Sequence, residues 1–204
     1  MAKKLLDLPT MLKTKRLIIR KYKEGDGAAL FNLLESNENR QYLKDHIDEA
    51  TEIKTEEEAE LRIRKLIADW IAQKRFIMGI WNKTSGLYIG QIWISPSKWK
   101  VPSFELGWFL ERTHQGQGFA SEAVNAAIQF LFHHLRAHKI IVLTRDDNVK
   151  SYNLAERCGF VKEGHLRDHN IKDGHRFGLF YYSMLKSEYL KQNKSDLLET
   201  IFTD

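Results

Sequence analysis

Apolar positions along this 204-residue chain recur with two different periods, and each change of period marks a change of element. Residues 16–22 (RLIIRKY) are apolar and β-branched and predict a strand, whereas leucines at helical spacing in residues 24–37 predict a short helix. Residues 46–53 are expected to form a loop. Residues 55–73 predict a longer helix, because they open on T-x-x-E, a capping box. The apolar stripe of this helix comprises Ala59, Ile63, Leu66, Ile67, Trp70 and Ile71.

After residue 74 the apolar positions recur with a period of two, which is typical of strands. Residues 76–82 and 87–95 are apolar runs separated by a turn and predict a hairpin, and residues 103–111 (SFELGWFLE) predict a third antiparallel strand. This order predicts one mixed α/β (α+β) domain with a largely antiparallel sheet of six or seven strands and no internal repeat. The later elements are a helix at 120–135, a buried strand at 139–144, a helix at 148–160, strands at 161–168 and 176–185, and a last helix or tail at 186–202.

The composition favours a protein of the reducing cytoplasm. Hydrophobic residues make up 43% of the chain, enough for a core, but no apolar run approaches the ~18 residues that a membrane span requires. The first residues contain no signal-peptide pattern. Cys158 is the only cysteine in the sequence, so no disulfide can form within the chain. We therefore expect a cytoplasmic protein without membrane association.

The formal net charge of +5 favours an anionic partner. No block of five or six basic residues occurs, so a phosphorylated cofactor is favoured over nucleic acid. Histidines do not change this interpretation. His133 and His134 do not share a helix face, and His134 with His138 has no third ligand, so no metal site is expected. A covalent mechanism through Cys158 is not expected either, since no base partner is recognisable.

Two glycines stand close together in residues 114–124 (HQGQGFASEAV), directly before a predicted helix. Such a loop exposes the unpaired N–H groups of a helix start to a phosphate. A plain tight turn that caps the helix explains the same glycines equally well. A P-loop is excluded because Phe119 and Ala120 follow Gly118, and a dinucleotide fingerprint is excluded because Ser121 stands where its third glycine belongs.

Gln115, Gly118 and Ala120 fit the pattern Q/R-x-x-G-x-G/A of the acetyl-CoA pyrophosphate loop. Further segments follow in order: RLIIR, IGQIWI, FELGWFL, DDNVKSYNLAERCGFVKEGHLRD and YYSMLKSEY. The chain thus resembles the GNAT superfamily of N-acetyltransferases, and within it the RimJ/RimL branch, whose members acetylate protein N-termini, including those of ribosomal proteins. The resemblance covers residues 13–189 as one domain, with residues 1–12 as an extension and 190–204 as a C-terminal tail.

The resemblance implies that the strand at 103–111 splays from the strand at 139–144, and that the pantetheine arm of acetyl-CoA lies in the resulting cleft as an added strand would. Basic side chains near the loop would meet the ribose phosphate. The cofactor contacts implied by the resemblance are Trp108, Phe109, Leu110, Gln115, Gly116, Gln117, Gly118, Phe119, Ala120, Ser121 and Asn148.

The resemblance also implies the catalytic groups. Many GNAT enzymes have a tyrosine acid at the position of Ala155, so this role is vacant here, and RimL-like members have a serine at the position of Ser151. We expect the Ser151 hydroxyl to protonate the leaving thiolate, although a plain helix-start serine is the alternative. Tyr152 is rotated about 100° away on the helix.

The base is left open among three choices. Glu105 ranks first, Asp168 second and water third. The spacing that gives a carboxylate in some RimL-like enzymes gives Asn170 here, and an amide is no base.

The expected acceptor is the N-terminal α-amine of a protein such as a ribosomal protein. A polyamine, an aminoglycoside or an amino acid is the alternative acceptor. A catalytically silent acyl-CoA-binding module is an alternative of another class. The oligomeric state stays open, with a homodimer among the options.

Overall fold

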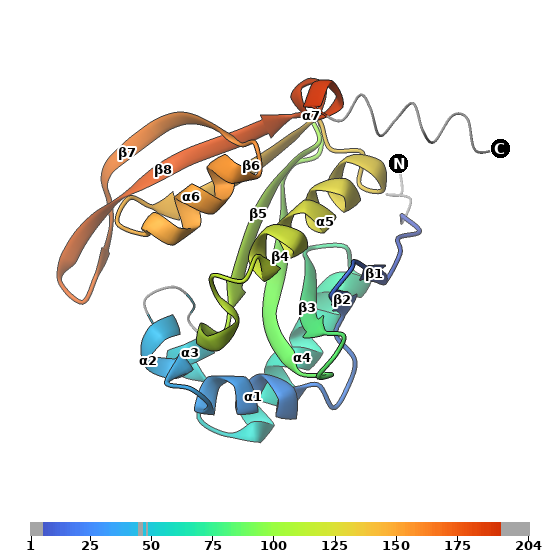
Figure 1. Cartoon of the computed structure of the whole chain (residues 1–204), viewed down its shortest axis with the longest axis vertical. Helices are drawn as coiled ribbons and strands as arrows, with labels where there is room; N and C mark the ends of the chain where they lie inside the picture. The colour runs from blue at the N-terminus through green and yellow to red at the C-terminus, as the bar shows by residue number, and fades with distance from the viewer. Residues whose placement is uncertain (1–5, 45–46, 48, 193–204) are drawn as a thin grey trace.

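The computed structural model describes residues 6–44, 47 and 49–192, and most of its strands and helices match the pattern of the sequence. Within these residues a single eight-stranded sheet forms the centre of the molecule (Figure 1). Its strands are β1 (Met11–Lys13), β2 (Leu17–Lys21), β3 (Phe76–Asn82), β4 (Tyr88–Lys98), β5 (Ser103–Leu110), β6 (Lys139–Arg145), β7 (Val161–Lys172) and β8 (His175–Leu185).

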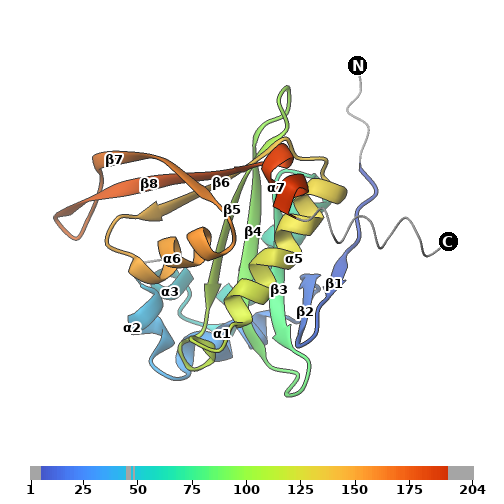
Figure 2. The same cartoon turned by 45° about the horizontal axis from the view of Figure 1, so that its top comes forward.

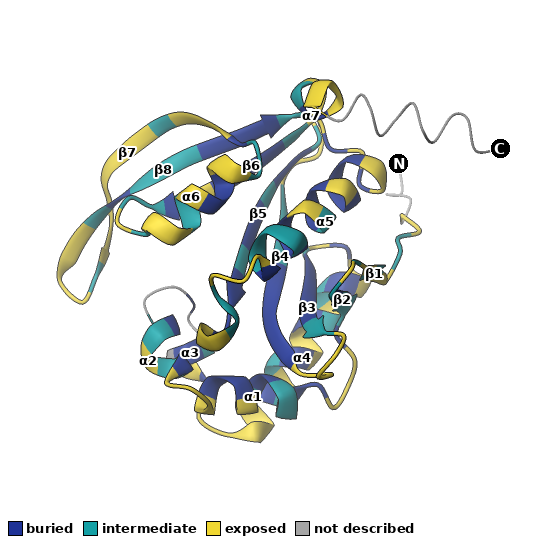
Figure 3. Ribbon diagram, viewed as in Figure 1, coloured by how far each residue is buried: buried dark blue, intermediate teal, exposed yellow. Residues whose placement is uncertain are grey.

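Two groups of helices cover the sheet on opposite faces. The α1–α4 group and the long helix α5 each bury an apolar face of their own against it, as Figure 2 shows from a second direction and Figure 3 by burial. Helix α6 lies beside β6 and β8. The helices are α1 (Gly27–Glu35), α2 (Asn39–Leu43), α3 (Glu49–Glu52), α4 (Glu56–Ile71), α5 (Phe119–His133), α6 (Val149–Arg157) and α7 (Lys186–Gln192), with a 3₁₀ turn η1 (Arg112–His114).

The strand order β1-β2-β3-β4-β5-β6-β8-β7 contains one parallel pair, β5 with β6. This pair is short: Ser103–Glu105 pairs with Lys139–Ile141, and the pairing stops there. β5 stays paired with β4 as far as Leu110, and β6 stays paired with β8 as far as Arg145. Beyond the paired residues, β5 therefore runs with β4, and β6 runs with β8. The edges of β5 and β6 that face each other separate. The splay expected between these strands is confirmed.

Helix α4 begins as its sequence predicts. The Thr55 hydroxyl oxygen accepts a hydrogen bond from the N–H of Glu58, and the Glu58 carboxylate accepts one from the N–H of Thr55. Most of the predicted stripe packs inward, with Ala59 and Ile63 at 0% exposure. Ile71 is an exception, since it is 66% exposed at the last residue of the helix, beyond the edge of the packed stripe.

Three expectations require correction. The sheet has eight strands, not six or seven, because Met11 and Leu12 of the expected extension belong to β1. The loop expected at 46–53 contains helix α3, and β7 continues four residues beyond the predicted end at 168. The predicted last helix is present as α7, and residues 193–202 lie outside the described residues. Over the part of the chain that the structure describes, none of the helices is both long and apolar enough to cross a bilayer.

Candidate active site

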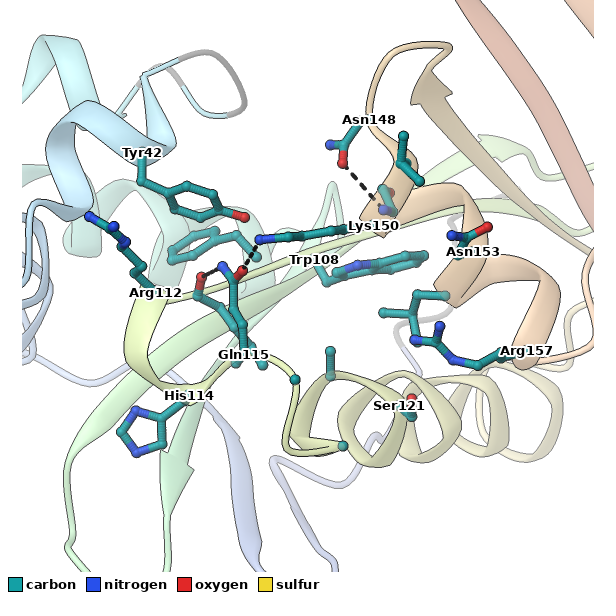
Figure 4. A pocket seen from close by; sticks show the side chains of 18 of the residues that line it. Tyr42, Trp108, Arg112, His114, Gln115, Ser121, Asn148, Lys150, Asn153 and Arg157 are labelled. Carbon is teal, nitrogen blue, oxygen red and sulfur yellow. Dashed lines mark hydrogen bonds between the residues drawn. The ribbon is translucent and has the colours of Figure 1, made fainter.

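A pocket of about 820 Å³ lies where β5 and α6 face each other across the start of α5 (Figure 4). Helix α2 lines it too, through Tyr42 and Leu43. The pocket therefore collects residues from three separate parts of the chain, 42–43, 108–121 and 148–157. Of the residues predicted to bind cofactor or to act in catalysis, those that line it are Trp108, Phe109, Leu110, Gln115, Gly116, Gly118, Ala120, Ser121, Asn148 and Ser151.

The two glycines of the loop both adopt the left-handed backbone conformation. The φ angle is 74° at Gly116 and 80° at Gly118, a region that side chains with a Cβ rarely adopt. Gly118 is the N-cap residue of α5, so the helix starts at the pocket wall. The first N–H groups of a helix lack helical partners and bear a partial positive charge. The loop is thus both a tight turn and a helix start that opens on the pocket.

Arg16 holds the loop in place. Its Nη1 donates to the carbonyl of Gln117 over 2.8 Å, its Nε donates to Glu122 over 2.6 Å, and its guanidinium lies 4.2 Å from the ring centre of Phe119. At two predicted cofactor residues of the loop, the side chain points away from the pocket. The side chain of Gln117 donates to the carbonyl of Thr113, and Phe119 is buried in the core, so neither side chain lines the pocket.

The first turn of α6 places Ser151 at the pocket. Asn148 is the N-cap, and its Oδ1 accepts a hydrogen bond from the Ser151 N–H over 3.2 Å. Ala155 is fully buried in the core. Tyr152 packs edge-on against Phe180 of β8, so it faces the sheet. Ser151 is thus the hydroxyl that α6 presents to the pocket.

Glu105 does not line this pocket. It belongs to the sheet face that carries Gly107, because side chains on a regular strand alternate. A Cβ at Gly107 would come within 2.0 Å of the Trp93 indole, so Glu105 lies on the Trp93 side, opposite α5. Burial raises the pKa of the Glu105 carboxyl. Asp168 is exposed, with φ 50° in the bulge of β7, and is outside the pocket.

The described residues that line the pocket include four basic side chains and no aspartate or glutamate. Arg112 and His114 come from η1, and Lys150 and Arg157 come from α6. Lys150 spans the mouth of the pocket: its Nζ donates to Oε1 of Gln115 over 3.0 Å and lies 5.5 Å from the ring centre of Tyr42 (Figure 4).

The sequence interpretation missed Tyr42, Lys150 and Arg157 as pocket residues. Lys150 and Arg157 were detectable, since they lie seven residues apart on one helix face that also includes Asn153 and Leu154. Tyr42 was not, because nothing in residues 39–43 predicts a helix at the cleft.

Among the described residues there is no group of three or more histidine, cysteine or acidic side chains placed to hold a metal ion. His133 instead lies 3.3 Å from the Tyr189 hydroxyl. Burial raises the pKa of the Cys158 thiol to about 11, so this group is neutral at physiological pH.

Comparison with known proteins identifies the family. Residues 16–161 match the model of the acetyltransferase (GNAT) domain. The chain is 30% identical over 179 residues to spermidine N(1)-acetyltransferase of Vibrio cholerae, which covers 88% of this chain and 98% of that protein. It is 35% identical over 69 residues, or 34% of this chain and 36% of the relative, to the ribosomal protein uS5-alanine N-acetyltransferase of Escherichia coli.

Comparison with solved structures finds the same fold. The solved structure of RimL, a ribosomal L7/L12 α-N-protein acetyltransferase in complex with coenzyme A, superposes with a TM-score of 0.77. It has 19% identity and covers 87% of this chain and 97% of that one. The family match spans most of the chain, including β5, the glycine loop and α6. The chain therefore belongs to the GNAT family of acetyltransferases and is an N-acetyltransferase with relatives among the RimJ/RimL-like enzymes.

Proposed function

We propose that this enzyme transfers the acetyl group of acetyl-CoA to the N-terminal α-amine of a protein, by direct attack of the amine on the thioester. One observation supports this most: the parted strands β5 and β6 and the glycine-opened start of α5 meet at a single pocket. The parting offers an unpaired strand edge, and the helix start offers unpaired N–H groups. A ligand with a peptide-like arm and a diphosphate matches this combination of groups.

Acetyl-CoA has such a structure. Its diphosphate would lie against Gly116–Ala120 with the Ser121 hydroxyl, since no side chain at Gly116 occupies that space. Its pantetheine arm would run along the inner edge of β5 and pair with backbone groups. The cationic lining of the pocket favours the negatively charged nucleotide.

The chain's own groups then divide the work of acyl transfer. A backbone N–H of Phe109 or Leu110 would stabilise the oxyanion. The Ser151 hydroxyl would donate a proton to the departing thiolate. The amine nitrogen bonds to the acetyl carbon, the carbon–sulfur bond breaks, and the amine proton passes through water to Glu105, which does not line the pocket. Water returns a proton to the Ser151 hydroxyl. The raised pKa of Glu105 brings this carboxyl closer to the pH at which a base works best.

The charge of the pocket lining supports an N-terminal α-amine as the acceptor. An α-amine has a pKa near 8, so a useful fraction is neutral at pH 7 and a modest base suffices. A polyamine carries several positive charges and would need carboxylates in its groove, whereas no aspartate or glutamate is among the described residues that line this pocket. Polyamine is retained as the second candidate because the Vibrio cholerae relative is named a spermidine acetyltransferase.

A panel of acceptors tests the proposal. Release of the coenzyme A thiol is measured with acetyl-CoA and, separately, N-terminal peptides, the same peptides with a blocked α-amine, spermidine and an aminoglycoside. We expect thiol release with free N-terminal peptides and none with blocked ones. Thiol release with spermidine but not with free N-terminal peptides would favour the second candidate. Absence of thiol release with every acceptor of the panel would contradict both candidates.

A further inference from the structure

A buried carboxylate links two segments that lead into the pocket lining. Glu111 directly follows β5 and is only 6% exposed. Its Oε2 accepts hydrogen bonds from the side-chain amides of Asn37 and Asn39, over 3.1 and 3.2 Å. Its Oε1 accepts from the Thr113 hydroxyl and from Nδ1 of His114. One oxygen therefore binds the turn between α1 and α2, and the other binds η1, which leads into the glycine loop.

Asn39 strengthens this link from the opposite side. It is fully buried, its Nδ2 also donates to the carbonyl of Leu33 over 2.9 Å, and its Oδ1 accepts from the backbone N–H of Arg112 over 2.8 Å. The turn itself is strained, with φ 52° at Asn37 and 55° at Glu38. A turn of this kind needs external hydrogen bonds to hold its shape.

The two linked segments lead to two parts of the pocket lining that face α6 (Figure 4). Three residues after Asn39, helix α2 presents Tyr42 and Leu43 to the pocket, and one residue after His114 the glycine loop begins with Gln115. Burial raises the pKa of Glu111, but the hydrogen bonds from Thr113, His114, Asn39 and Asn37 outweigh this and lower it overall, so the carboxylate is the stable form.

We propose that Glu111 is a positioning residue that couples the glycine loop to helix α2, so that nucleotide binding at the loop orders α2. This inference rests on the proposed function, in which the glycine loop binds the nucleotide at the pocket that α2 also lines. Glu111 touches neither substrate. It acts through Asn39 on one side and through Thr113 and His114 on the other.

The variant Glu111→Gln tests the coupling. An amide has one acceptor oxygen and one NH₂ group. Its oxygen can accept from the donors of one linked segment only, and its NH₂ group would then point at the donors of the other segment, where no hydrogen bond can form. Glu35→Gln is the matched control. Glu35 also joins α1 to α2, through an ion pair with Arg40, but it is half exposed and does not reach residues 111–114.

Hydrogen–deuterium exchange measures the effect with coenzyme A as the probe, because coenzyme A lacks the acetyl group and leaves every amine unchanged. We expect saturating coenzyme A to slow exchange at the backbone amides of residues 39–44 by about fivefold or more in wild type and in Glu35→Gln. In Glu111→Gln we expect less than a twofold effect at residues 39–44, with protection at residues 115–121 retained. A merely structural role for Glu111 would lower the melting temperature and leave this protection in place.

A second variant covers the case in which Glu111→Gln does not fold. Asn37→Gly keeps the left-handed φ and removes one donor to Oε2, so we expect an intermediate loss of protection in α2. Full protection of residues 39–44 in both variants would overturn the coupling. Absence of protection there in wild type that does bind coenzyme A would overturn it too, and either result would leave the proposed function unaffected. Failure of wild type to bind coenzyme A would overturn both.

Discussion

The carboxylate of Glu122 accepts two hydrogen bonds from Arg16, one from the backbone N–H over 2.7 Å and one from Nε over 2.6 Å. Glu122 is in the first turn of α5, and Arg16 directly precedes β2. The Thr14 hydroxyl donates to the same carboxylate. Because Arg16 also binds the carbonyl of Gln117, the N-terminal part of the chain holds the glycine loop in its left-handed shape.

This relationship predicts a pH dependence of stability. Burial raises the pKa of Glu122, but hydrogen bonds from Thr14 and Arg16 outweigh this and hold it below its ordinary value. The ionised group therefore stabilises the fold fully above the unfolded carboxyl pKa, roughly 4.3, and loses this effect as the pH falls through the lower folded value. Melting temperatures measured from pH 7 to pH 3 should fall less steeply in Glu122→Gln than in wild type. Parallel curves would contradict the role, and Glu56→Gln, an exposed carboxylate on α4, serves as control.

Gly118→Val should abolish acetyl-CoA binding. The new Cβ would lie 3.3 Å from Nη2 of Arg16, and the branched side chain would stand at the helix start that the diphosphate needs. The left-handed φ adds about 1–3 kcal/mol of strain. Gly86→Val is the matched control, because Gly86 has φ 70° in a hairpin turn with nothing within 4 Å of its Cβ position. Isothermal titration should show binding to the control alone. Equal affinity in both variants would contradict the loop assignment.

Ser151→Ala should lower kcat by about 100-fold, the usual contribution of a positioned proton donor, with little change in acetyl-CoA affinity. The backbone hydrogen bond from residue 151 to Asn148 is kept, so the start of α6 should stay intact. Ser121→Ala, across the pocket, should instead raise the KM for acetyl-CoA and leave kcat nearly unchanged. Steady-state kinetics separates the two, and an unchanged kcat in Ser151→Ala would remove this hydroxyl from the mechanism.

Glu105→Gln should remove the acidic limb of the pH–rate profile. Because burial raises the pKa of Glu105, wild-type kcat/KM should begin to fall at a pH above that expected for an exposed glutamate as the base becomes protonated. The variant should lose about 100-fold in kcat/KM at pH 7, and its profile should be flat on the acid side. A variant with wild-type rates would leave water as the acceptor of the proton. Asp168→Asn is the companion test of the second-ranked base.

Local chemistry explains which parts of the fold were predictable. The capping box of α4 and the glycines before α5 set the local backbone conformation within a few residues of themselves. The sequence pattern alone is therefore enough to predict where these two helices begin. Helix α2 is five residues long and has no side-chain cap. Its position depends on Asn39 bonding to Glu111, a contact between residues 72 positions apart. Periodicity does not detect contacts of this kind.

The same distinction applies to the site. Gln115, Gly118 and Ala120 form a compact motif, and nearly all the predicted cofactor residues line the pocket. Gln117 and Phe119 belong to the same motif, but Arg16, about a hundred residues earlier, directs the loop so that their side chains point elsewhere. Glu111 was visible in the sequence only as the last residue of a predicted strand. Its four donors come together only in the folded chain.

Titration of the wild-type protein with acetyl-CoA in a calorimeter tests the central claim most directly. The parted strands and the helix start at one pocket predict saturable binding of one acetyl-CoA per chain, with a dissociation constant in the micromolar range. Titration with acetate and adenosine, which lack the diphosphate and the pantetheine arm, should give no such binding. Absence of saturable binding of acetyl-CoA at millimolar concentration would contradict the account.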